Sequence, residues 1–294
     1  MSVSSGKFEI KVPASIANLG PGFDTLAVAV QLYLRLRARV VPGQGELHFQ
    51  FVGSRLDGEN YIERAFRFLA NQRGGQFPSL SVEVQSEIPM RSGLGSSAAA
   101  TVAGLRLFEA AVGRALPQGG LLNAACALEH HPDNVAAALL GGLTLSCQLP
   151  DRSVVAKRVD WPSSVRFLVL TPHYPLSTTE SRSVLPERVS REEAVFNVQR
   201  VALLLQSLQS GDFSLLREAL QDRLHQPFRQ GLVPGLQQAL QLEHPDLLGV
   251  CLSGAGPSVV ALAQQNLDEV EELLAESFRQ AGLTFCLRRL AAHG

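Results

Sequence analysis

Hydrophobic and polar positions along the chain alternate in short runs that predict many strands and several helices. From Leu32 to Val40 every second residue is apolar, with Tyr33 and three arginines between them, which indicates a strand with one buried and one wet face. Other apolar runs predict strands over residues 8–12, 47–51, 80–87, 153–159, 165–171, 247–252, 257–262 and 284–290. The alanine-rich stretch from Ser96 to Val112 predicts a helix packed tightly against a sheet. Amphipathic spacing predicts further helices over residues 191–209, 213–224 and 266–280.

The order of these elements indicates the fold class and a division into domains. Strands and helices mix without a regular βαβ alternation, and no internal repeat is present, so the sequence predicts an α+β fold. A length of 294 residues is enough for two ordinary domains that each bury a core. We place the boundary near residues 149–152, a polar turn with a proline after a glycine-rich stretch, so the predicted domains are residues 1–150 and 151–294.

Composition and charge favour small molecules as partners. Lysine and arginine together number 26 and aspartate and glutamate 27, so the chain lacks the basic excess of a nucleic-acid-binding protein. The first residues have no apolar core of signal-peptide length, and no later stretch is apolar enough to span a membrane, so we expect a cytoplasmic protein without membrane contact. Four widely spaced cysteines without a C-x-x-C pair argue against a zinc site or a disulfide framework. Whether the chain forms a homodimer stays open.

The segment I-P-M-R-S-G-L-G-S-S-A-A-A, from Ile88 to Ala100, is a glycine-serine loop that leads directly into the alanine-rich helix. Glycines let main-chain N–H groups approach an anion closely, serines add hydroxyl donors, and a helix start adds unpaired N–H groups and a partial positive charge. Such a loop binds phosphate without a lysine. It is not a Walker A motif, because no lysine follows the last glycine, so a different nucleotide-binding family is implied. The alternative is an ordinary strand-to-helix turn.

Two other segments are dense in turn-forming residues. P-A-S-I-A-N-L-G-P-G-F-D, from Pro13 to Asp24, would present Asn18 and Asp24 from an irregular loop between apolar strands. The alternative is a surface turn in which both side chains hydrogen-bond to their own backbone. L-S-G-A-G-P-S, from Leu252 to Ser258, is a glycine turn between two apolar strands.

The polar segment E-H-H-P-D-N, from Glu129 to Asn134, follows an apolar helix. His130 and His131 suggest a metal site, but adjacent histidines point in different directions on a helix, and no H-x-x-x-H or C-x-x-C partner accompanies them, which argues against zinc. Glu129 is better interpreted as an oxygen ligand for Mg²⁺, the cation that accompanies nucleotide phosphates. The alternative is a solvated helix end.

These four segments, in this order and at these spacings, resemble the GHMP superfamily of small-molecule kinases and, within it, the homoserine kinase family. The segment from Pro13 is similar to the family's first motif, P-x-x-x-G-L-G-S-S-A-A from Pro89 to its ATP loop, and S-G-A-G-P-S to its third motif. H-P-D-N-V-A, from His131, distinguishes homoserine kinases from mevalonate or galactose kinases. L-S-T-T-E-S-R-S-V-L-P, from Leu176, and D-R-L-H-Q-P-F-R, from Asp222, support the same resemblance.

The resemblance implies a two-domain GHMP kinase fold, with an N-terminal domain like domain 2 of ribosomal protein S5, a C-terminal ferredoxin-like domain and an active site between them. It implies phosphoryl transfer from ATP to L-homoserine, a Mg²⁺-dependent step toward threonine. Asn60 would touch the adenine, and Ser97 and Glu129 would lie near the metal. The phosphates would be wrapped by Pro89, Met90, Arg91, Ser92, Gly93, Leu94, Gly95, Ser96, Ser97, Ala98 and Ala99.

The resemblance also implies an acceptor pocket. Asn18 and Asn134 would take part in the transfer, and the substrate would be bound by Asp24, His131, Thr178, Arg182 and Arg229. Asp24 suits the ammonium of homoserine, the two arginines suit its carboxylate, and Asn18 with His131 suits its hydroxyl. No general base is assigned, because Asn134 cannot take a proton and phosphoryl transfer depends mainly on positioning and electrostatic stabilisation.

The sequence departs from the usual family pattern at three points. His130 stands where a glycine is common, Ala137 where a proline is common, and Ser15-Ile16 where Thr-Ser is common. His130 raises a question about the backbone, since a glycine there could adopt conformations that histidine resists.

Other functions stay open. In a GHMP kinase for mevalonate or a sugar, Arg182 and Arg229 would not both line the pocket, and each could instead form a surface ion pair. A nucleotide-binding sensor without turnover is the other alternative, against which Glu129 and the unbroken phosphate loop speak.

Overall fold

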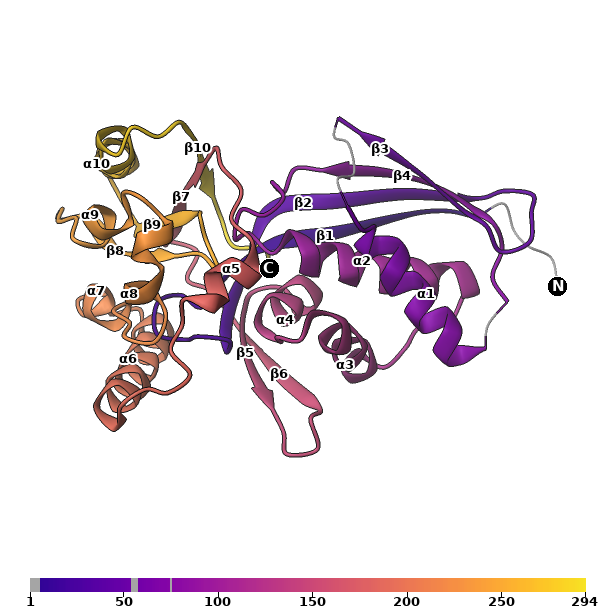
Figure 1. The fold of residues 1–294 in the computed structure, drawn as a ribbon, viewed down its shortest axis with the longest axis horizontal. Coiled ribbons are helices and arrows are strands. Elements are labelled where there is room, and N and C mark those ends of the chain that lie inside the picture. Colours follow the sequence, from indigo (N-terminus) through magenta and orange to yellow (C-terminus); the bar gives the residue numbers. More distant parts are fainter. Residues whose placement is uncertain (1–5, 54–57, 75) are drawn as a thin grey trace.

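The chain forms two β-sheets that lie side by side, each accompanied by helices (Figure 1). This computed structural model describes residues 6–53, 58–74 and 76–294. Helices α1 (Tyr61–Arg73), α2 (Ser96–Val112), α3 (Gln118–Glu129) and α4 (Asp133–Leu140) lie on one side of the first sheet. None of the described helices is both long and apolar enough to cross a bilayer.

The first sheet has the strand order β3-β4-β2-β5-β6, with β1 paired to β2. Its strands are β1 (Lys7–Ala17), β2 (Leu26–Val40), β3 (Leu47–Val52), β4 (Leu80–Ser86), β5 (Leu143–Gln148) and β6 (Val154–Val159). Strands β3 and β4 run parallel and are joined through α1, whereas the other pairs are antiparallel. Strand β2 begins six residues before the predicted Leu32, because residues 26–30 are buried on both faces and so show no alternation.

The predicted helix from Ser96 to Val112 is confirmed, and its small residues explain how it packs. A Cβ on Gly104 would lie 2.2 Å from the carbonyl oxygen of Ile62 in α1, so the two helix backbones approach more closely than any other residue allows. Phe66 of α1 and Phe108 of α2 meet edge to face, 5.4 Å between ring centroids, in the core beneath the first sheet. Helix α2 therefore holds its N-terminal end, with the glycine-serine loop, in a rigid position.

The second sheet contains β7 (Arg166–Pro172), β8 (Leu247–Leu252), β9 (Val259–Ala263) and β10 (Phe285–Leu290) in the order β10-β7-β9-β8, all antiparallel. A four-stranded sheet with its fourth, first, third and second strands side by side is the ferredoxin-like arrangement that was predicted. The helices of this half are α5 (Thr178–Ser183), α6 (Arg191–Ser210), α7 (Leu216–Ala219), α8 (Gln226–Arg229), α9 (Leu236–Leu240) and α10 (Leu267–Gln280).

The structure differs from the sequence prediction after α6, and it shows where the chain passes from the first sheet to the second. The predicted helix over residues 213–224 is wrong, since α7 covers only Leu216–Ala219. The buried Asp222 accepts main-chain hydrogen bonds from residues 224–226 and so turns the chain into α8. The turn at residues 149–152 joins β5 to β6 within the first sheet, so the change of sheet falls after Val159. The division into two domains near residue 150 stays a prediction.

Candidate active site

Three of the segments singled out in the sequence meet where the two sheets adjoin. The N–H of Gly254 donates to the carbonyl of Ala17 at 3.1 Å, and the Asn18 amide donates to the Gly254 carbonyl at 3.2 Å. The Ser253 hydroxyl donates to the carbonyl of Gly93 at 2.7 Å. The first motif, the glycine-serine loop and the third motif are therefore one hydrogen-bonded unit.

The glycine-serine loop presents its N–H groups and not its carbonyls. The carbonyl oxygens of residues 91–94 each accept a hydrogen bond from another segment, donated by Leu176 N, Ser258 N, Ser253 Oγ and Ser15 N at 3.2, 3.0, 2.7 and 3.2 Å. The N–H groups of residues 91–98 donate to no acceptor in the described part of the chain. Helix α2 begins after Gly95 without a side-chain cap, so its first N–H groups also stay unpaired. This arrangement of aligned free donors suits an anion.

Gly93 and Gly95 are required by the geometry of this loop. Their φ angles are 81° and 69°, in the left-handed region. A Cβ on Gly93 would lie 2.3 Å from the carbonyl oxygen of Ser253, and one on Gly95 would lie 2.1 Å from the hydroxyl of Ser15. Ser92, Leu94 and Ala98 of the predicted phosphate loop have buried side chains and can offer an anion only their main chain, whereas the N–H of the buried Ala99 already donates to the Gly95 carbonyl at 2.9 Å.

An oxygen-rich corner lies at the start of α2. The Glu129 carboxylate accepts hydrogen bonds from the Ser97 hydroxyl at 2.9 Å and from the Thr101 hydroxyl at 2.7 Å. The Glu129 side chain is only 6% exposed, and Arg64 Nη2 lies 3.9 Å from its Oε1. A buried carboxylate with a neighbouring hydroxyl is a donor set that fits Mg²⁺. Among the described residues no cluster of three or more His, Cys, Asp or Glu side chains suits a metal such as zinc.

Asn60, which was predicted to contact the adenine, stabilises the start of α1. It is the N-cap of α1, and its side-chain oxygen accepts from the N–H groups of Ile62 at 3.1 Å and Glu63 at 3.3 Å. Its amide nitrogen donates to no described residue and stays available to a ligand. Contact with adenine stays a prediction.

On the acceptor side, Asp24 and Arg182 meet although they are 158 positions apart. The guanidinium grips the carboxylate with two hydrogen bonds of 3.1 and 2.6 Å. Thr178 lies one turn before Arg182 on α5 and is exposed. His131 Nδ1 lies 3.4 Å from the buried Asp133 carboxylate. Burial lowers the pKa of His131, but the Asp133 carboxylate outweighs burial, so the pKa lies above its ordinary value.

The two asparagines predicted for the transfer lie beside the loop and the third motif. Asn134 accepts a 2.7 Å hydrogen bond from the Ser15 hydroxyl, and its oxygen lies 3.0 Å from the Cβ position of Gly95. Asn18 is buried and joins two segments, since its oxygen accepts from the N–H of Asp24 while its nitrogen donates to Gly254. Asn134 therefore lies directly beside Gly95 of the glycine-serine loop.

Arg229 is a buried cation that has no carboxylate partner among the described residues. It is 1% exposed, and its nitrogens donate to three neutral acceptors: the carbonyls of Ser181 at 3.2 Å and Gly254 at 3.0 Å, and His225 Nδ1 at 3.1 Å. No described residue forms an ion pair with it. Burial and the neighbouring Arg182 charge lower the pKa of Arg229 to about 10.

Backbone strain is concentrated in these segments. Of the described non-glycine residues with positive φ, five lie in the site segments: Asn18, Leu19, Asp24, Arg91 and His130. His130 ends α3 with φ 64°, so it takes the left-handed conformation that a glycine would adopt there. The backbone before His131 therefore has the conformation that the usual glycine would give it. Strain of this kind persists where surrounding structure holds it, commonly at functional sites.

Comparison with known proteins places the chain in a family. The model for the GHMP kinases N terminal domain matches residues 60–142, and that for GHMP kinases C terminal matches residues 204–280. Homoserine kinase of Solibacter usitatus is 39% identical over 96% of this chain and 93% of that protein, and homoserine kinase of Moorella thermoacetica is 38% identical over 96% of each. The crystal structure of homoserine kinase from Cytophaga hutchinsonii matches with a TM-score of 0.87 at 25% identity, covering 100% of this chain and 96% of that one.

The chain belongs to the homoserine kinase family of GHMP kinases. It is therefore an ATP-dependent small-molecule kinase, and the predicted two-domain GHMP kinase fold is confirmed. The sensor alternative loses its support, since the family is one of enzymes.

In this member of the homoserine kinase family, the structure adds residues that the sequence reasoning did not assign. Phe23 lies among the charged groups, with the guanidinium carbons of Arg182 and Arg229 each 5.4 Å from its ring centroid. His225 contacts Arg229, and Asp133 contacts His131. All three stand inside stretches that the motifs already include, but only the fold shows which of their neighbours they touch.

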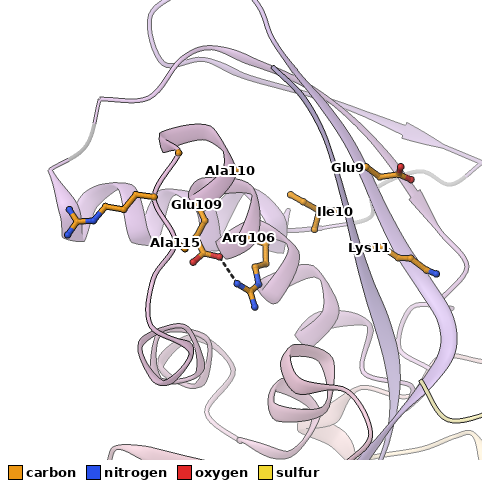
Figure 2. A pocket seen from close by; sticks show the side chains of 9 residues that line it. Glu9, Ile10, Lys11, Arg106, Glu109, Ala110 and Ala115 are labelled. Carbon is orange, nitrogen blue, oxygen red and sulfur yellow. Dashed lines mark hydrogen bonds and ion pairs between the residues drawn. The ribbon is translucent and has the colours of Figure 1, made fainter. Parts of the chain in front are cut away.

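A cavity of about 450 Å³ lies away from the converged motifs, between β1 and the C-terminal half of α2 (Figure 2). Glu9 and Lys11 line it from the strand, and Arg106 and Glu109 from the helix. Arg106 donates to the Glu109 carboxylate at 2.8 Å, and the same carboxylate accepts from the N–H of Leu116. Glu109 therefore stabilises the end of α2, and none of the predicted site residues lines this cavity.

Proposed function

We propose that this protein transfers the γ-phosphoryl group of ATP to the side-chain hydroxyl of L-homoserine. The products are ADP and O-phospho-L-homoserine, a precursor of threonine, and the hydroxyl proton is released. Mg²⁺ accompanies the nucleotide. The proposal combines the family membership with the charges that the acceptor side presents.

The observation that carries the proposal is the buried guanidinium of Arg229. A desolvated cation with only neutral acceptors is costly, and an anion that arrives with the substrate reduces that cost. Arg229 Nη2 makes no hydrogen bond to the described residues, so one edge of the fork is free for a carboxylate oxygen. Neither mevalonate nor a sugar offers the pair of charges that homoserine carries, although mevalonate also has a carboxylate.

The ammonium group is the second feature of the substrate. Asp24 is available to it, since its side chain is 34% exposed while it holds Arg182. The substrate ammonium would share Asp24 with Arg182, and the carboxylate would lie between the guanidinium groups of Arg182 and Arg229. Phe23 beneath both guanidinium groups limits their movement. Thr178, exposed one turn before Arg182, is available to the same substrate groups.

The hydroxyl must reach the nucleotide. Asn134 is close to both partners because it lies beside Gly95 of the phosphate loop and one residue from Asp133, which faces His131. Homoserine anchored at Arg229 and Asp24 would extend its hydroxyl toward Asn134 and His131, with Asn18 bracing the loop behind them. Asn134 would orient the hydroxyl but could not accept its proton.

The nucleotide side uses main-chain donors and one metal. The free N–H groups of residues 91–98 would bind the phosphates, and Ser97 with Glu129 would hold Mg²⁺, which neutralises charge on the transferring group when bound. Transfer then depends on alignment of the hydroxyl with the γ-phosphorus and on stabilisation of the equatorial oxygens. No general base is assigned.

One assay tests the proposal. Purified protein is incubated with Mg²⁺ and ATP together with homoserine, mevalonate, galactose, serine or threonine, and ADP release is measured. We expect turnover with homoserine and a phosphomonoester product that phosphorus NMR detects. Turnover with mevalonate or galactose but none with homoserine rejects the proposal, and no turnover with any compound indicates a protein that binds nucleotide without catalysis.

A further inference from the structure

His225 lies between Arg229 and the loop of the first motif, and it is fully buried. Its Nδ1 is 3.1 Å from Arg229 Nη1, and its Nε2 is 2.8 Å from the carbonyl oxygen of Gly20. We propose that His225 is a positioning residue that sets the orientation of Arg229 toward the carboxylate of the acceptor substrate. The inference rests on the proposed function, since it concerns the same acceptor pocket.

The two contacts of the ring define its protonation. A guanidinium can only donate, so Nδ1 must be the unprotonated nitrogen that accepts from Arg229. A carbonyl can only accept, so Nε2 must carry the proton that is donated to Gly20. His225 is therefore neutral and held in one tautomer, and a second proton would remove the acceptor that Arg229 uses.

Charged and polar neighbours hold the ring in this state. Asp222 accepts from the N–H groups of residues 224–226 at 2.9, 2.9 and 2.7 Å and from the Asn197 amide at 2.7 Å. These donors fix the backbone from which His225 projects. The Phe23 ring stacks on the imidazole with centroids 5.2 Å apart. The charged groups that act on the imidazole are Asp222, Arg229 and Asp24, and burial lowers the pKa of His225 despite the two carboxylates.

This arrangement couples three segments through one side chain. The carbonyls of Ser181 and Gly254 hold Nε and Nη1 of Arg229, and His225 adds the one side-chain acceptor among its contacts with the described residues. His225 occupies one of its two terminal nitrogens and leaves the other for a carboxylate. The bond to Gly20 holds the proton on Nε2 and so keeps Nδ1 available as the acceptor that orients Arg229.

Two substitutions separate the two bonds. An asparagine oxygen can take the place of Nδ1, so His225→Asn keeps an acceptor for Arg229 and loses the donor to Gly20. A glutamine nitrogen can take the place of Nε2, so His225→Gln keeps the donor to Gly20 and loses the acceptor. The pair thus removes one hydrogen bond at a time from the same buried position.

We expect His225→Gln to raise the homoserine KM by roughly 10- to 100-fold, the loss of one hydrogen bond to a charged group, while the ATP KM stays unchanged. His225→Asn should keep the homoserine KM within about threefold of the wild type. Circular dichroism and thermal melting of both variants check folding. An unchanged homoserine KM in His225→Gln, or equal effects of both variants on both substrates, overturns the proposal.

A measurement on the wild type keeps the inference testable if a variant does not fold. Long-range proton–nitrogen NMR of protein labelled at its histidine nitrogens reports which ring nitrogen carries the proton. We expect a protonated Nε2 and an unprotonated Nδ1 for His225 near neutral pH, and a protonated Nδ1 overturns the proposal. Absence of homoserine turnover in the wild type would instead reject the proposed function, so the two failures are distinguishable.

Discussion

The glycine-serine loop and the surroundings of Arg229 would each bind an anion, by different physical means. The loop offers the free N–H groups of residues 91–98, while the carbonyls of residues 91–94 are bonded to other segments. The surroundings of Arg229 offer a side-chain cation that is buried among neutral acceptors. The loop carries partial charges that need no desolvation of an ion, whereas Arg229 is a full charge removed from water.

The difference concerns specificity. Aligned N–H groups recognise a phosphate by its shape and charge and accept any nucleotide that reaches them. A buried guanidinium favours a substrate whose carboxylate reaches it at one position and in one direction, because its charge has no ion-pair partner before the substrate binds. Selectivity for the acceptor substrate should therefore depend far more on Arg229 and the groups that hydrogen-bond to it than on the glycine-serine loop.

Arg229→Ala should have the largest effect, and it tests whether recognition of the acceptor depends on this side chain. We expect the kcat/KM for homoserine to fall by roughly 10²- to 10³-fold, because a buried charged partner of the substrate carboxylate is removed, while the ATP KM stays nearly unchanged. Steady-state kinetics with each substrate varied in turn measures this. Arg229→Lys should recover only part of the loss, because an ammonium keeps the charge without the fork.

Arg106→Ala is the matched control, since Arg106 is an ion-paired arginine in the C-terminal half of α2, beside the cavity that none of the predicted site residues lines. It should leave both KM values unaltered. If Arg229→Ala changed the ATP KM as much as the homoserine KM, the two anion sites would not be separate.

On the nucleotide side, Glu129→Gln should raise the Mg²⁺ concentration for half-maximal rate by about 10- to 100-fold, because an amide is a weaker ligand than a carboxylate. The homoserine KM at saturating Mg²⁺ should not move. Rates measured across a Mg²⁺ titration give the result. Glu109→Gln removes the charge of a buried glutamate within α2, and it should leave the Mg²⁺ requirement as it is.

The smallest expected effect is a pH dependence of stability from His225. Burial lowers the pKa of His225 in the folded protein, so below the ordinary value of about 6.5 the unfolded chain takes up a proton that the folded chain does not. Its contribution is complete above that pH and declines as the pH falls toward the folded pKa. Urea denaturation of the wild type and His225→Asn between about pH 5 and pH 8 should show the free-energy difference shifting against the wild type at acid pH. A constant difference would mean that His225 does not titrate this way.

Sequence patterns predicted local elements well where the local signal was strong. The helix at Ser96 to Val112 was correct because its composition and the preceding loop both mark it. The first half of β2 was missed because burial on both faces removes alternation. The prediction of a helix over residues 213–224 was wrong. The Asp222 carboxylate accepts hydrogen bonds from the main chain of the next turn, which ends one helix and begins another.

The candidate site shows the same division. The chemical groups could be predicted from motifs and from the family resemblance, including the loop, Glu129 and the two arginines. The pairing of Asp24 with Arg182 could not, and neither could the lack of an ion pair between Arg229 and any described carboxylate, because the partners lie far apart along the chain. A residue's charge is visible in sequence, but whether that charge is paired depends on which distant segment folds against it.

By itself, the amino-acid sequence determined the glycine-serine loop before a helix, the α+β class and the family, because these depend on consecutive residues whose conformations and spacing are local properties. Only the tertiary structure decided that the N–H groups of this loop stay unpaired among the described residues and that His225 meets both Arg229 and Gly20. Those outcomes depend on contacts between distant segments. Burial removes water from each polar group, which must then hydrogen-bond to whichever group the packing places beside it.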